Sequence, residues 1–220
     1  PRLHTENSLS KLFRNSFIKL KPINKNLIDL LWKRKKDLNA KSFYLIGDKK
    51  AGEKLKDKIS KVKKQIISSK IDYLFTTASE NIAWLLNIRG SDTDYSPLPN
   101  SHAFINKKGE VILFCNLKKI NRSLKSKLSK QIKIYDFNQL PNFISSLLNK
   151  KILIDILTCS VFFKTLIKKN NIVLEKNDPI YFLKSLKNKT EINNSIKSHI
   201  YDGAALTKYL FWLKNNFKTK

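Results

Sequence analysis

The chain contains no methionine, and its first residue is Pro1. A complete translation product begins with methionine, so we expect these 220 residues to be a piece of a longer protein. The sequence therefore does not decide whether a leader peptide precedes it. It also contains no apolar run near the roughly 18 residues that suggest a membrane-spanning helix. We expect no membrane partner.

Cysteine and histidine are scarce. Cys115 and Cys159 form neither a Cys-x-x-Cys pair nor a zinc-binding spacing. Both lie in apolar sequence, which predicts buried free thiols and a reducing compartment. The three histidines, His4, His102 and His199, are far apart in the chain, and we expect His4 to be solvated.

Acidic residues are few, 17 against 44 basic ones, so the formal net charge is +27. One interpretation is a nucleic acid or another anionic surface as partner; the other is a solvated, lysine-rich surface. Only 5 of the basic residues are arginine and 39 are lysine, whereas phosphate and base recognition favour the arginine fork. The composition therefore favours the solvated surface. We expect no specific nucleic-acid partner, only weak attraction to polyanions.

Short apolar runs alternate with amphipathic segments along most of the chain. We predict strands at 71–77, 101–106, 110–116, 132–137, 151–155 and 171–175. Gly109 falls between the second and third runs, where a hairpin turn needs a positive φ. Helices are predicted at 55–67, 117–131, 140–148 and 159–168, the first from a stripe of Leu55, Ile59, Val62, Ile66 and Ile67. This pattern indicates an α/β domain on a mixed sheet.

The two ends of the chain lie outside this pattern. Residues 1–21 form a partial element, 27–32 a short helix with Trp32 as a packing residue, and 33–48 a linker. A long helix is predicted from Thr190, its N-cap, to about Phe217. We expect its buried face to consist of Ile192, Ile196, Ile200, Leu206, Leu210, Leu213 and Phe217.

The stretch Ala-Ser-Glu-Asn-Ile-Ala-Trp-Leu-Leu-Asn-Ile-Arg-Gly-Ser-Asp, residues 78–92, follows the first predicted strand. Its apolar residues recur at helical spacing. Ser79 is the expected N-cap and Gly90 the expected C-terminal stop. A polar loop, residues 91–100, follows.

From Thr77 to Pro97 this stretch resembles the Xaa-Pro aminopeptidase family, in its long multi-domain cytosolic form. Further similar segments are Pro-Ile-Asn-Lys-Asn-Leu-Ile-Asp at residues 22–29, the Ala-Gly-Glu step at 51–53, and residues 199–206. The resemblance implies a creatinase/prolidase N-terminal-like α/β domain with a mixed sheet flanked by helices. It divides the chain into the tail of a first N-terminal domain and linker (1–40), a second such domain (50–177), and the first helix of a pita-bread catalytic domain (178–220).

The resemblance also implies a chemistry. Xaa-Pro aminopeptidases release the N-terminal residue that precedes proline. Two divalent metal ions, usually Mn²⁺, are held by two Asp, one His and two Glu, and activate the attacking water. In the family these ligands follow the long helix, so they would lie beyond Lys220. We therefore expect no catalytic or metal-binding residue in this chain, which alone would be inactive. Short proline-containing peptides as substrate, a homodimer and a cytoplasmic location are expected of the whole protein.

One loop is expected to affect function. Arg89, Asp92 and Tyr95 are predicted to line the substrate entrance of the complete enzyme; the alternative is that Arg89 pairs with Asp92 and fixes the loop. Asp92 and Asp94 make only a weak metal pair, because one residue separates them and no histidine is near. His199 has a structural interpretation, as a packed or surface residue, and a functional one near the active site. The sequence departs from the family at 98–102, where bulky apolar residues are more usual.

A second function stays open. Creatinase-like and pita-bread domains also occur in non-catalytic binding proteins, for example the large subunit of a histone chaperone. In such a protein the basic surface would matter. Metal ligands encoded after Lys220 would support the enzyme, and their absence the binding module.

Overall fold

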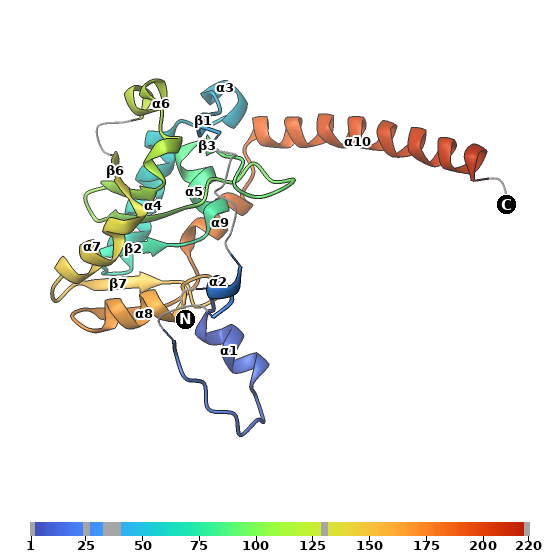
Figure 1. Ribbon diagram of the computed structural model, residues 1–220. Helices are drawn as coiled ribbons and strands as arrows, with labels where there is room; N and C mark the ends of the chain where they lie inside the picture. Colours follow the sequence, from blue (N-terminus) through green and yellow to red (C-terminus); the bar gives the residue numbers. More distant parts are fainter. Residues whose placement is uncertain (1–2, 24–26, 33–40, 129–131, 218–220) are drawn as a thin grey trace.

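The computed structural model describes residues 3–23, 27–32, 41–128 and 132–217. Within them the central feature is a six-stranded mixed sheet with helices on both faces (Figure 1). Its strands are, in chain order, β2 (Tyr73–Thr76), β4 (Ser101–Asn106), β5 (Val111–Cys115), β6 (Ile132–Asp136), β7 (Lys151–Ile154) and β8 (Ile172–Glu175). All six predicted strands are confirmed, with ends shifted by at most two residues.

The strand order is β6-β5-β4-β2-β7-β8. The central pairs β2–β4 and β4–β5 are antiparallel, and the outer pairs β5–β6, β2–β7 and β7–β8 are parallel. The β4–β5 hairpin turns at Gly109, whose φ of 87° confirms the prediction for this glycine. Parallel strands need a crossover connection, usually a helix, which agrees with the predicted alternation of strands and helices along the sequence.

Two apolar cores lie on opposite faces of the sheet, because neighbouring residues of a strand point to opposite sides. Leu74 belongs to one core and Phe75 to the other. The first core is covered by α4 (Leu55–Ser68), α5 (Ser79–Leu86) and α9 (Pro179–Ser185). The second is covered by α7 (Leu140–Ser146) and α8 (Val161–Lys168). Both thiols, Cys115 and Cys159, are buried and free, as predicted.

Several predicted helix ends are wrong by a few residues. Ala78, not Ser79, holds the N-cap position of α5, and the helix stops at Asn87 rather than Gly90. Asn87 adopts the left-handed conformation, with φ of 52°, which asparagine tolerates better than most residues. The long helix begins after Asn188 instead of Thr190. The asparagine side chain can accept from a free N–H of the first turn just as threonine can.

The helix predicted at 117–131 is interrupted. It consists of a 3₁₀ turn, η1 (Leu117–Lys119), and a short helix, α6 (Arg122–Lys127). The side chains of Asn116 and Asn121 each accept a hydrogen bond from a backbone N–H of the turn that follows. Asn116 thus caps η1, and Asn121 caps α6. Residues 129–131 of the prediction lie outside the described residues.

The predicted linker 33–48 is only partly a linker. Residues 33–40 lie outside the described residues, but Phe43 is 1% exposed and packs in the first core. The two-residue strand β1 (Tyr44–Leu45) then pairs antiparallel with β3 (Ile88–Arg89), and α3 (Asp48–Ala51) follows. The end of this segment is therefore part of the α/β domain.

The N-terminal arm, residues 3–23, begins with α1 (Glu6–Leu12) and extends away from the sheet (Figure 1). It is attached near its start, where the N–H of Val161 donates to the His4 carbonyl at 2.9 Å. After the arm comes α2 (Ile28–Leu31), and Trp32 is 61% exposed. The packing role of Trp32 stays a prediction.

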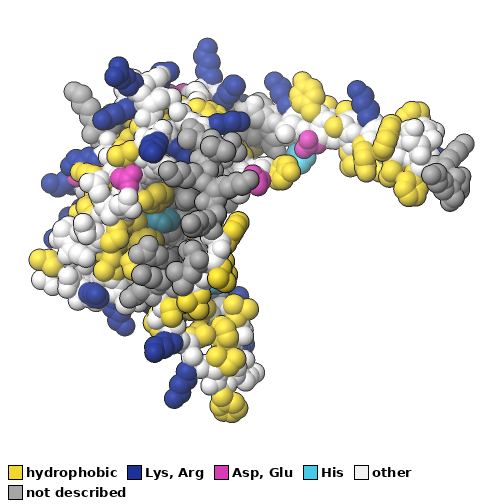
Figure 2. Space-filling model, in the orientation of Figure 1, with side chains coloured by type: hydrophobic (Ala, Val, Ile, Leu, Met, Phe, Trp, Pro, Cys, Tyr) yellow, Lys and Arg dark blue, Asp and Glu magenta, His cyan; other side chains and the backbone are white. Residues whose placement is uncertain are grey.

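The last helix, α10 (Lys189–Asn216), projects from the domain as a single rod (Figure 1). Its predicted buried face is wrong for the described chain, because none of its residues is buried. Figure 2 shows apolar side chains along its length and on the N-terminal arm. No helix in the described ranges is long and apolar enough to cross a membrane.

Candidate functional site: the loop between β3 and β4

The loop 91–100 leaves the domain between β3 and β4. Arg89, just before it, is half-buried, and its Nη1 donates to the carbonyls of Ala83, at 2.9 Å, and Ile88, at 2.8 Å. Ala83 is among the last four residues of α5, whose carbonyls have no partner within the helix. Burial lowers the pKa of the Arg89 guanidinium below its usual value. Arg89 thus joins the start of the loop to the end of α5.

The loop is closed at its base by Asp92. One carboxylate oxygen accepts the backbone N–H of Asn100 at 2.6 Å, and the other pairs with the ammonium of Lys119. The Asp92 and Lys119 side chains are 7% and 9% exposed. Lys119 lies in η1, and its own carbonyl accepts the N–H of Phe43 at 2.8 Å. The two ends of the loop are therefore fixed to the domain through a buried ion pair.

Gly90 lets the two ends of the loop approach closely. A Cβ at this position would lie 2.8 Å from the Cα of Pro99 and 2.9 Å from the carbonyl oxygen of Leu98. The N–H of Gly90 donates to the Pro97 carbonyl at 3.2 Å, and that of Asp92 to the Leu98 carbonyl at 3.3 Å. The glycine that the sequence suggested as a helix stop is thus needed for contact between backbones.

Tyr95 stands at the tip of the loop and is fully exposed, with a φ of 60°. A positive φ is uncommon for a tyrosine, and backbone strain of this kind often occurs at functional sites. Beside it is an open depression of about 350 Å³. Its lining comes from the loop, from β1 and from the segment just before β1, including Lys41, Tyr44, Thr93, Asp94 and Pro97.

The three predicted entrance residues therefore have different surroundings. Arg89 and Asp92 do not pair with each other; each holds the loop through other groups. The expected ion pair between them is not formed, because Lys119 is the partner of Asp92. Tyr95 alone of the three is fully exposed. Nothing in the sequence singled out Lys119, which is one of 39 lysines.

No metal-binding cluster occurs in the described part of the chain, where no three His, Cys, Asp or Glu side chains are placed to hold an ion. His102 packs among the rings of Phe75, Phe137 and Phe163, and burial lowers its pKa to about 4. His199 is exposed on α10. A two-ion centre of two Asp, one His and two Glu does not fit the residues that the structure describes.

The carboxyl ends of the parallel strands, where α/β sheets often bind ligands, hold a buried polar network. The Asp178 carboxylate accepts from the Asn81 amide at 3.0 Å, and the Asp178 N–H donates to Asp155 at 2.8 Å. Burial raises the pKa of Asp178 above its usual value. Tyr181 also donates to Glu80 at 2.7 Å. These groups bind one another and attach α9 to the sheet, so their arrangement is structural.

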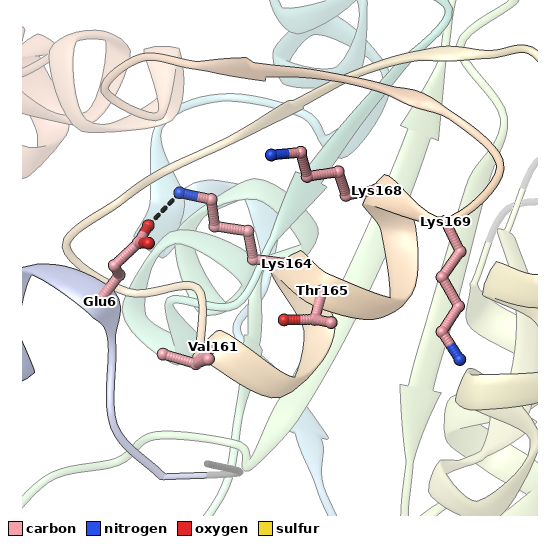
Figure 3. A pocket seen from close by; sticks show the side chains of 6 residues that line it. All are labelled: Glu6, Val161, Lys164, Thr165, Lys168 and Lys169. Carbon is pink, nitrogen blue, oxygen red and sulfur yellow. Dashed lines mark hydrogen bonds and ion pairs between the residues drawn. The ribbon is translucent and has the colours of Figure 1, made fainter. Parts of the chain in front are cut away.

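A second open hollow, about 320 Å³, lies between α1 and α8 (Figure 3). Lys164 extends toward Glu6 of α1 and also pairs with Glu175 at 2.8 Å. Although burial opposes it, the hydrogen bonds to Glu175 and Glu6 raise the pKa of Lys164. Lys168 and Lys169 complete a basic rim. Because Lys164 is already paired with two carboxylates, no function is assigned to this hollow.

A family model of the creatinase/prolidase N-terminal domain matches residues 34–191. Among curated proteins, the chain is similar to a probable Xaa-Pro aminopeptidase P of Coprinopsis cinerea, with 29% identity over 89% of this chain and 34% of the relative. It is 30% identical to Xaa-Pro aminopeptidase 1 of Dictyostelium discoideum, over 92% of this chain and 33% of the relative. It is 31% identical to Xaa-Pro aminopeptidase ApepP of Drosophila melanogaster, over 89% of this chain and 33% of the relative. The chain thus spans about a third of the length of these relatives.

A solved structure with a similar fold is the X-prolyl aminopeptidase of Caenorhabditis elegans, described as a cytosolic enzyme with a di-nuclear active site. The TM-score is 0.82 at 24% sequence identity, covering 96% of this chain and 36% of that one. At this identity the likeness establishes the fold, and it confirms the predicted α/β class with its mixed sheet and flanking helices.

Proposed function

The chain belongs to the creatinase/prolidase N-terminal domain family and is homologous to the N-terminal region of Xaa-Pro aminopeptidase P. On that premise we propose that it is part of a metal-dependent aminopeptidase. The complete protein would release the N-terminal residue that precedes proline from short peptides. The similarity to Xaa-Pro aminopeptidases over about nine-tenths of the chain is the observation that carries this proposal.

The role proposed for this chain is architectural. No step of hydrolysis is assigned to it, because its described residues do not fit the donor set that two divalent ions require. Two Mn²⁺ ions bound elsewhere in the complete protein would activate water and stabilise the developing negative charge. Alone, the 220-residue chain would be inactive.

We also propose a division of the chain into three parts. Residues 1–40 would end a first N-terminal domain, 50–177 form the second, and 178–220 begin the pita-bread domain. The exposed apolar residues at both ends support this division. Ile200 and Leu206 of α10 are 65% and 58% exposed, and Phe17 of the N-terminal arm is fully exposed. Such surfaces are usually covered by a partner or another part of the same protein.

The loop 91–100 would rim the substrate entrance. In Figure 1 it extends toward the side of the domain from which α10 projects. Tyr95 would contact the peptide, while Arg89 and Asp92 would hold the loop that presents it. The exposure of Tyr95 and the buried anchors at the base of the loop support this assignment.

A cytoplasmic location and a homodimer complete the proposal. The buried free thiols of Cys115 and Cys159 suit a reducing compartment, and the Caenorhabditis elegans enzyme is described as cytosolic. The homodimer rests on the family resemblance and is tested by light scattering of the complete protein.

The proposed activity is tested with the complete protein that contains this chain. Supplied with Mn²⁺, it should release the first residue of a tripeptide with proline in second place, and a chelator should abolish the release. A tripeptide with alanine in place of proline is the control. Hydrolysis by the 220-residue chain alone would contradict the architectural role. A folded complete protein without activity would instead favour the non-catalytic, creatinase-like binding module with its basic surface.

A further inference from the structure

The joint between the α/β domain and α10 is confined to the start of the helix. Asn188 Nδ2 donates to the Ala51 carbonyl at 2.9 Å, and Asn194 Nδ2 to the Lys50 carbonyl at 3.1 Å. Beyond Asn194 every side chain of α10 is exposed except the partly exposed Leu213. The helix has 28 residues, which makes it roughly 42 Å long, so a tilt of roughly 10° at its base moves its far end by roughly 7 Å.

Lys58 lies behind this joint and is only 1% exposed. Its ammonium donates to the Trp84 carbonyl at 3.0 Å and to Oδ1 of Asn87 at 2.8 Å. It also lies over the Trp84 ring, 4.4 Å from the centroid. One cation therefore contacts both the backbone and the ring face of the same tryptophan, which fixes the orientation of the indole.

Trp84 connects this cation to α10. Its indole Nε1–H donates to Oε1 of Glu191 at 3.2 Å. The other oxygen, Oε2, accepts the N–H of Asn188 at 2.9 Å and so completes the capping box of the helix. Glu191 thus joins the first turn of α10 to the indole that Lys58 orients.

The charges support the same connection. A buried ammonium is costly unless it is compensated. Burial lowers the pKa of Lys58 to about 8, and the carboxylates of Glu191 and Glu53 oppose this shift. Glu191 is on α10, so docking of the helix provides part of the compensation for the buried charge. The cation and the helix therefore stabilise each other.

We propose that Lys58 is a positioning residue that sets the direction of α10, by holding the Trp84 indole so that its N–H meets Glu191. The role does not depend on the proposed peptidase activity. A side chain acting only in the core would affect stability without altering the angle between the helix and the domain.

The test measures that angle in the full 220-residue chain. Spin labels are attached through Lys125→Cys on α6 and Lys208→Cys on α10, both exposed positions. The native thiols of Cys115 and Cys159 are 0% and 3% exposed, so they should resist labelling. Double electron–electron resonance spectroscopy then gives the distribution of the distance between the two labels.

The labelled parent should give one narrow distribution. Lys58→Met should widen it at least two-fold. Trp84→Phe, which keeps an aromatic ring but removes the N–H donor, should widen it as well. Lys64→Met is the matched control, because Lys64 is exposed on the same helix, and it should leave the distribution unchanged.

Glu191→Ala should widen the distribution, and Glu191→Gln, which keeps one of the two acceptor oxygens but not the charge, should widen it less. An unchanged distribution in folded Lys58→Met overturns the proposal. If circular dichroism shows that Lys58→Met does not fold, the Trp84→Phe variant provides the test. An unchanged distance distribution in Trp84→Phe then overturns the proposal.

Discussion

Asp92 and Lys119 form an ion pair in which both side chains are less than 10% exposed, although they are 27 residues apart in the chain. The pair joins the loop 91–100 to η1. Because it is buried, its two charges depend on each other: removing one leaves the other without a partner in a medium where an unpaired charge is costly.

Breaking this pair should lower stability. Lys119→Met is expected to reduce the free energy of unfolding by about 3 kcal/mol, since it leaves the Asp92 carboxylate buried and unpaired. Urea unfolding measures the loss. The neighbouring Lys118→Met, at an exposed position, should change little. The double variant Asp92→Asn/Lys119→Met should be less destabilised than the sum of the single changes; strict additivity would show that the charges do not interact.

Gly90 and Gly203 provide a matched pair of substitutions. Gly90→Ala should cost about 1–3 kcal/mol, because the new Cβ meets the backbone of Pro99 and Leu98. Gly203 lies within α10 with no atom within 4 Å of a new Cβ, so Gly203→Ala should stabilise the chain by about 1 kcal/mol or less through helix propensity. Thermal unfolding of both variants checks the opposite signs.

The pKa of His102 predicts a pH dependence. Burial lowers it from 6.5 to about 4, so between these values the unfolded chain binds a proton that the folded chain does not. Stability should therefore fall as pH decreases from 6.5 to 4, by about 3 kcal/mol in all. His102→Phe should remove this part of the pH dependence, measured by urea unfolding at several pH values. His199→Asn, at an exposed site, should keep it.

Tyr95 and Arg89 should behave differently in the complete protein. Tyr95→Ala should raise KM for proline-containing peptides several-fold and leave stability nearly unchanged, because the side chain is fully exposed. Arg89→Ala should lower stability, since two backbone carbonyls lose their donor. An unchanged KM in the Tyr95 variant would contradict the proposed entrance role.

The capping box of α10 gives a final prediction. Asn188→Ala should destabilise the chain by about 1–2 kcal/mol, because the Glu191 N–H loses its acceptor. The Ala51 carbonyl loses a donor as well. Asn193→Ala, at an exposed position of the same helix, should have little effect on the thermal midpoint. Equal effects of the two substitutions would show that the cap does not stabilise the joint.

The sequence predicted the strands better than the helix ends. A strand such as β5 is buried on both faces and appears as a continuous apolar run, so its position follows from composition alone. Helix ends depend on which of several competent side chains caps the first turn. Ser79 and Thr190 were plausible caps, but Ala78 and Asn188 hold the positions. Asn116 and Asn121 divided a helix that the apolar pattern alone made continuous.

The candidate site was predictable only in part. The resemblance from Thr77 to Pro97 pointed to the loop that carries Tyr95, and a polar, proline-containing segment after a helix is expected at the surface. It did not predict the partner of Asp92, since Lys119 is distant in sequence and chemically identical to many solvated lysines. For the same reason Lys58 on α4 could not be distinguished from the lysines on the opposite face of that helix.

By itself the sequence determined the α/β class, the positions of the six strands of the main sheet along the chain, and the family, because these depend on the spacing of apolar residues and on a long continuous motif. The tertiary structure alone decided which charges are buried, and with what partners. Asp92 meets Lys119, and Lys58 meets Trp84, only after distant segments pack together. The cost of burying a charge depends on that three-dimensional environment, which no local pattern of residues contains.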